Sequence, residues 1–166
     1  MRSAAAGSSL FFALAPGVVA GVVPWLITGW EAEPAWLGWR VLGALVTAAG
    51  AAVLVHAFAR FVREGVGTPA PVAPTERLVV GGLYRWVRNP MYLAVVACVA
   101  GQAGVFGRPV LLAYAAGLLV LFVAFVRSYE QPTLTRRFGA DYEAYVRAVP
   151  GWWPRAPRRA SRSSAS

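Results

Sequence analysis

The sequence is poor in charged residues and in cysteine. Only 14% of its 166 residues are charged, whereas 58% are hydrophobic, and the mean hydropathy is +0.54. So much hydrophobic content excludes a disordered chain, and the lack of a glycine period excludes a collagen-like one. The single cysteine, Cys98, excludes a disulfide scaffold. At this length, which suits about one domain, the composition predicts a compact integral membrane protein.

Lysine is absent, so arginine alone supplies the positive side of the net charge of +9. A basic balance is also typical of nucleic-acid-binding proteins, but here the arginines stand beside apolar segments, as they do at a membrane surface. We therefore expect membrane lipids as partners and no nucleic acid. No group of His, Cys and acidic residues has metal-ligand spacing, so no metal site is expected. There is no phosphate-binding P-loop and no Rossmann glycine motif.

Four apolar segments are long enough, or nearly so, to cross a membrane as helices, which takes about 20 residues. They cover residues 8–29, 36–60, 90–106 and 109–127. We interpret the last two as a hairpin that turns at residues 107–109, with a partly re-entrant pair as the alternative. The predicted fold class is an all-α integral membrane bundle of about four transmembrane helices, with a cytoplasmic loop and a C-terminal amphipathic helix.

Arginines are concentrated between the second and third segments and after the fourth. The positive-inside rule then places the middle loop and both termini in the cytoplasm, here of a bacterial inner membrane. The first apolar run is longer than a signal-peptide core and is expected to stay uncleaved. Residues 1–154 are expected to form a single domain, and residues 155–166 a disordered basic tail.

Small residues four apart indicate how the helices pack, because lipid provides no hydrophobic drive between helices. Such spacing occurs on the second, third and fourth segments. The residues concerned are Ala44, Ala48 and Ala52, then Ala97 and Gly101, then Ala113 and Gly117.

Two polar segments are candidates for function. The first, residues 64–90, ends in Arg88-Asn89-Pro90, which reads as a helix start with Asn89 as N-cap and Pro90 in the first turn. A helix start favours an anion, and Arg88 adds a planar cationic group that suits a carboxylate or phosphate. The alternative is that Arg88 reaches lipid headgroups, with Trp86 and Tyr92 as interfacial aromatics.

The second polar segment follows the fourth apolar one. Glu130 is the acid closest to the end of that apolar helix, where a carboxylate is costly unless it has a partner, and an opposing Arg88 would supply one. After Gly139 the spacing predicts a short amphipathic helix with Tyr142, Tyr145 and Val149 on one side.

These segments resemble the isoprenylcysteine carboxyl methyltransferase family, whose relatives include phospholipid N-methyltransferases. The resemblance covers roughly residues 65–154. Its motifs are Gly-Thr-Pro-Ala-Pro at 67–71, Gly-x-Tyr-Arg-x-x-Arg-Asn-Pro-Met-Tyr at 82–92, Glu-x-Pro-x-Leu at 130–134, and Phe-Gly-x-x-Tyr-x-x-Tyr followed by Val-Pro and Trp-Pro within 138–154. Each motif is weak alone, but the ordered set around a helical hairpin is specific.

The resemblance implies an integral membrane enzyme that binds S-adenosylmethionine at its cytoplasmic face. Arg88 and Glu130 would be the catalytic residues. Family members often have His at Asn89 and a second Glu at Gln131; neither Asn nor Gln titrates, which leaves the acceptor chemistry open. The cofactor contacts carried over are Tyr84, Arg88, Asn89, Pro90, Tyr92 and Glu130, with Phe138, Tyr142 and Tyr145 covering the adenosine.

The predicted function is methyl transfer from S-adenosylmethionine to a lipophilic acceptor, which is a lipid or small molecule with a carboxylate, amine or thiol group. Glu130 serves as a cofactor anchor or, for an amine, as a base. His56 lies one turn before Arg60 and is interpreted as structural. The alternatives are a membrane reductase that uses NADPH and a non-enzymatic lipid-binding membrane subunit. The sequence leaves the oligomeric state open.

Overall fold

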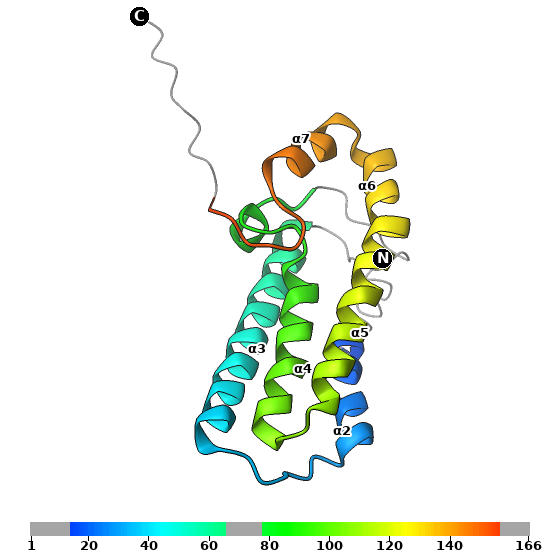
Figure 1. The fold of residues 1–166 in the computed structure, drawn as a ribbon. Helices are drawn as coiled ribbons and strands as arrows, with labels where there is room; N and C mark the ends of the chain where they lie inside the picture. The colour runs from blue at the N-terminus through cyan, green and yellow to red at the C-terminus, as the bar shows by residue number, and fades with distance from the viewer. Residues whose placement is uncertain (1–13, 66–77, 157–166) are drawn as a thin grey trace, which may run out of the picture.

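The computed structural model describes residues 14–65 and 78–156, and every regular element in these ranges is a helix, as predicted. The helices lie side by side as a bundle, and the last helix lies across one of its ends (Figure 1). The elements are η1 (Val18–Val22), α2 (Val23–Thr28), α3 (Leu37–Gly65), η2 (Gly82–Arg85), α4 (Pro90–Phe106), α5 (Val110–Phe125), η3 (Val126–Glu130), α6 (Gln131–Phe138) and α7 (Ala140–Ala148).

Two of these helical stretches, Leu37–Arg60 and Val110–Phe138, are long and apolar enough to cross a membrane. Leu14–Thr28 and Pro90–Phe106 are shorter apolar helices beside them. Large apolar side chains on the outside of the bundle are exposed, among them Val120 at 70%. An outer surface of this kind suits lipid, and the fold is that of a membrane helical bundle.

Several predicted boundaries need correction. The second apolar helix continues past Arg60 to Gly65, and the fourth does not stop at Arg127 but runs on through η3 and α6. Proline explains how the fourth one continues. Pro132 has no N–H to offer the preceding turn, and the π-turn of η3 immediately before it accommodates the missing bond without ending the helix. Of the predicted tail, residues 155–166, the part beyond residue 156 lies outside the described residues.

The first helix contains a second π-turn, η1, placed in the same way before Pro24. Side chains of the neighbouring helices satisfy its carbonyl groups. Gln102 Nε2 of α4 donates to the Ala20 oxygen at 2.6 Å, and the Tyr114 hydroxyl of α5 donates to the Val19 oxygen at 3.0 Å. These bonds fix the first helix against α4 and α5 in a setting where water is not available to replace them.

The α3–α4 contact is the closest in the bundle, and it is made by glycines. A Cβ on Gly43 would lie 2.7 Å from the Val105 nitrogen, and one on Gly104 would lie 2.8 Å from the Trp39 oxygen. Gly101 is buried in this contact, as the spacing predicted. The other predicted stripes are wrong, because they face outward; the exposed residues are Ala44, Ala48, Ala52, Ala113 and Gly117.

The α4–α5 hairpin turns where predicted. Gly107 ends α4 with a φ of +66°, and a Cβ there would lie 3.0 Å from the Glu33 oxygen, which makes glycine the suitable residue. Arg108 holds the turn by an ion pair of 2.6 Å between its Nη1 and Glu33 Oε1. This end of the bundle lies opposite α7 (Figure 1). Residues 90–127 therefore form two antiparallel helices, of which α4 is the shorter, and α4 begins at the same end of the bundle as α7.

Candidate active site

The start of α4 is hydrogen-bonded to the chain segment that follows α7. The Arg88 backbone N–H donates to the Pro150 oxygen at 2.9 Å, and Asn89 Nδ2 donates to the Gly151 oxygen at 3.1 Å. Asn89 stands at the N-cap position, but its side chain makes no capping hydrogen bond. The sequence therefore predicted the helix start correctly, but the Asn89 side chain tethers the C-terminal segment to that start.

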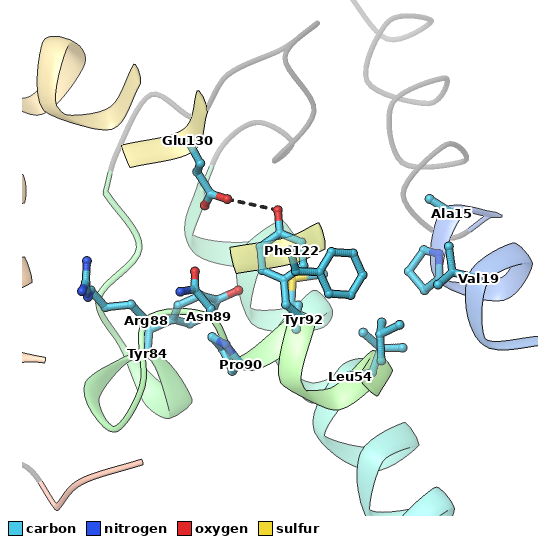
Figure 2. Close-up of a pocket in the computed structure, with 13 residues that line it drawn as sticks. Ala15, Val19, Leu54, Tyr84, Arg88, Asn89, Pro90, Tyr92, Phe122 and Glu130 are labelled. Carbon is cyan, nitrogen blue, oxygen red and sulfur yellow. Dashed lines mark hydrogen bonds between the residues drawn. The ribbon is translucent and has the colours of Figure 1, made fainter. Parts of the chain in front are cut away.

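Glu130 is partly buried and reaches toward the first turn of α4 from η3 (Figure 2). Its Oε2 accepts a hydrogen bond from the Tyr92 hydroxyl at 3.0 Å. Among the described residues no ion pair joins Glu130 to Arg88, so the expected pairing is replaced by a tyrosine four residues further along. Among the described residues, Tyr92 is thus the one hydrogen-bond partner of the carboxylate, and the remaining acceptor capacity is available to a ligand.

One pocket brings most of the predicted site residues together. It has a volume of about 180 Å³ and contains Arg88, Asn89 and Glu130 on one side, with Val19 and Leu54 on the other (Figure 2). The predicted residues that line it are Tyr84, Arg88, Asn89, Pro90, Tyr92 and Glu130.

The residues of the apolar half of the pocket could not be predicted from the sequence. Phe122 of α5 packs on the Tyr92 ring with 4.8 Å between the ring centroids, while Leu54 comes from α3 and Val19 from the first helix. Apolar residues are frequent on all these helices, so only their packing selects the ones that face the pocket. The result is a cavity with polar groups at one end and an apolar wall between helices.

Arg88 carries an unused donor. Its Nε is buried and has no hydrogen-bond partner, and no carboxylate among the described residues lies within ion-pair distance of it. Its side chain also interacts with the hydroxyl of Tyr142. Burial raises the pKa of Tyr142, and the positive charge of Arg88 with a hydrogen bond from its side chain opposes the rise. The guanidinium is thus available for an anion.

The three aromatic residues expected at the adenosine lie outside the lining of this pocket. Tyr142 and Tyr145 pack against each other on α7, 6.4 Å between ring centroids, and the Tyr145 hydroxyl donates to the Tyr84 oxygen at 2.8 Å. Phe138 lies under the guanidinium of Arg137. Burial raises the pKa of both Tyr84 and Tyr145, so both hydroxyls stay protonated and can donate hydrogen bonds.

The amphipathic character of α7 is confirmed, since Tyr142 is buried and Glu143 is exposed. Val149 is also buried, but it lies just past the end of the helix in extended backbone, and not on the helix as predicted. His56 is exposed on α3 and does not line the pocket. Among the described residues no group of His, Cys and acidic side chains is placed to hold a metal ion.

The fold and this pocket define a helical membrane protein with a pocket at one end of its bundle. The chain matches the family model for phospholipid methyltransferases over residues 39–141, more than half its length, and it belongs to that family. The match includes both Arg88 and Glu130, and it supports membrane methyl transfer rather than the reductase or non-enzymatic alternatives. Comparison with curated proteins and with solved structures gives no match.

Proposed function

We propose that the protein transfers a methyl group from S-adenosylmethionine to a lipophilic acceptor at the cytoplasmic face of the membrane. Phospholipid methyltransferases and isoprenylcysteine carboxyl methyltransferases are related, and the motifs at 82–92 and 130–134 favour the isoprenylcysteine carboxyl methyltransferase family for this chain. The observation that carries the proposal is the composition of the pocket. It contains the buried Arg88 Nε, which has no hydrogen-bond partner, and the Glu130 carboxylate, which among the described residues accepts a hydrogen bond from Tyr92 alone, and its remaining wall is apolar.

The side chains fit the amino-acid end of this cofactor. That end is a zwitterion, with a carboxylate and an ammonium group. Arg88, whose buried Nε has no hydrogen-bond partner, suits the carboxylate. Glu130, which in the described part of the chain accepts a hydrogen bond from Tyr92 alone, suits the ammonium. Both groups line the same pocket, so one ligand can meet both.

The pocket is smaller than the roughly 300–1,000 Å³ of pockets that bury a drug-sized ligand, so it suits only part of the cofactor. The nucleoside then lies outside the pocket, where Tyr142 next to Arg88 offers an aromatic surface. Tyr145 and Phe138 remain predicted members of the adenosine site.

S-adenosylmethionine supplies a methyl group already activated on a sulfonium. The protein therefore has to position the acceptor, keep water away and, for an amine acceptor, remove a proton. The apolar wall of Val19, Leu54 and Phe122 suits an acceptor that reaches the pocket from the bilayer. Glu130 is the base for an amine, whereas a carboxylate or thiolate needs none.

Isothermal titration of the detergent-solubilised protein with S-adenosylmethionine tests the proposal. We expect saturable binding, weakened roughly 10- to 150-fold in Arg88→Met and in Glu130→Gln, the range for one lost hydrogen bond to a charged group. Arg136→Gln and Glu143→Gln remove the same charges at exposed positions away from the pocket and serve as controls. Absence of saturable binding to the wild-type protein contradicts the proposal, and a melting shift with NADPH instead favours a reductase.

A further inference from the structure

We propose that the outer surface of α3 and α4 binds an anionic phospholipid, with one acyl chain in a groove between the two helices and the phosphate at three arginines beside it. Among the described lining residues, the groove shares only Pro90 with the pocket described above, and the hollow beside the arginines shares none with it. Tyr145, a predicted member of the adenosine site, lines this hollow, so the two sites adjoin, but the proposal does not depend on the methyl-transfer activity.

The groove is the first observation. It has a volume of about 440 Å³ and lies between α3 and α4, and none of the described residues that line it is charged. On α4 the groove extends from Pro90 to Ala97, a rise of about 10 Å. This length accommodates the part of an acyl chain that lies next to the lipid headgroup. The lining of the groove includes Val46, Val53, Leu93, Ala97, Trp86 and Pro154.

The second observation is a hollow of about 430 Å³ lined by Arg85, Arg147 and Arg155. None of the described residues that line it is acidic. Arg147 Nη1 lies 3.8 Å from the Glu143 carboxylate, and this exposed pair is weak because solvent screens it. The hollow is therefore positively charged and suits a phosphate group.

The groove and the hollow adjoin each other. Trp86 and Pro154 line the groove, while Arg85 and Arg155, their neighbours in the chain, line the hollow. The Arg155 backbone N–H donates to the Trp86 oxygen at 3.0 Å, which fixes the two chain segments side by side. Trp86 is 46% exposed, in the position of an aromatic residue at the membrane interface. An apolar groove that ends at a cationic hollow at this level complements an anionic lipid rather than free phosphate.

Native mass spectrometry of the delipidated, detergent-solubilised full chain tests the site. Phosphatidylglycerol is the anionic probe, and phosphatidylcholine with the same acyl chains is the zwitterionic control. We expect selective binding of phosphatidylglycerol, about thirtyfold weaker in the double variant Arg85→Gln/Arg155→Gln. Arg136→Gln removes a charge outside the hollow and should bind as the wild type does.

A second variant tests the groove without a change of charge. Ala49 lines the groove and is exposed, so Ala49→Phe fills the groove without entering the core, and we expect it to weaken phosphatidylglycerol binding. Circular dichroism verifies the helical content of each variant. If the double variant does not fold, the wild-type lipid preference and Ala49→Phe decide the question.

Three results would overturn the proposal. These are equal binding of the two lipids, full binding by Ala49→Phe, and displacement of phosphatidylglycerol by inorganic phosphate. The last two outcomes would mean that the arginines attract phosphate without a lipid site.

Discussion

Replacement of Gly101 by alanine probes the contact that places α4, and with it the start of the pocket. A Cβ on Gly101 would lie 2.7 Å from both the Gly43 oxygen and the Thr47 nitrogen. These are backbone atoms of α3, so the two helices would have to separate. Overpacking of this kind costs about 1–3 kcal/mol.

Gly117→Ala is the matched control. Both glycines lie inside apolar helices, but a Cβ on Gly117 would meet nothing within 4 Å. Each substitution gains about 1 kcal/mol of helix propensity. That gain cancels in the comparison, so Gly101→Ala should have a free energy of unfolding about 1–3 kcal/mol below that of Gly117→Ala. Unfolding of the purified proteins in mixed micelles of increasing dodecyl sulfate content measures the difference. Equal unfolding midpoints for the two variants would refute the close α3–α4 contact.

Two further predictions concern the polar end of the pocket. Tyr92→Phe removes the hydrogen bond to Glu130 and should lower the free energy of unfolding by about 1–3 kcal/mol in the same assay. An unchanged free energy of unfolding would mean that the Glu130 carboxylate needs no hydrogen-bond partner in the folded protein. Asn89→Ala and Asn89→Asp both lose the donor to the Gly151 oxygen and should speed amide hydrogen exchange in the segment after α7. Wild-type exchange in Asn89→Asp would point to helix capping instead, because aspartate caps as well as asparagine does.

The sequence was sufficient for the features that depend on local chemistry. Long apolar runs predicted the helices, Asn89-Pro90 predicted where α4 begins, and Gly107 predicted where it ends. The spacing after Gly139 predicted which side of α7 is buried. In each case a single turn or a short periodic stretch determines the structure, so no distant partner has to be known.

The features that failed depend on which helices meet. Small residues occur on more than one face of α3, and only the approach of α4 selects Gly43 and Gly50 over the alanine stripe. The sequence predicts that the partner of Glu130 lies at the start of α4, which is correct, but it favours Arg88, whereas the structure shows Tyr92. The π-turn that carries Glu130 into position has no sequence signal except the proline after it.

Methyl transfer at this pocket can be measured with a labelled methyl donor. The purified protein is incubated with lipid extract and S-adenosylmethionine labelled on its methyl group, and the label in the organic phase is then counted. We expect a labelled lipid-soluble product with the wild type, little of it with Arg88→Met or Glu130→Gln, and wild-type amounts with Arg136→Gln. Equal labelling by the wild type and both pocket variants would show that the proposed transfer does not take place at this pocket.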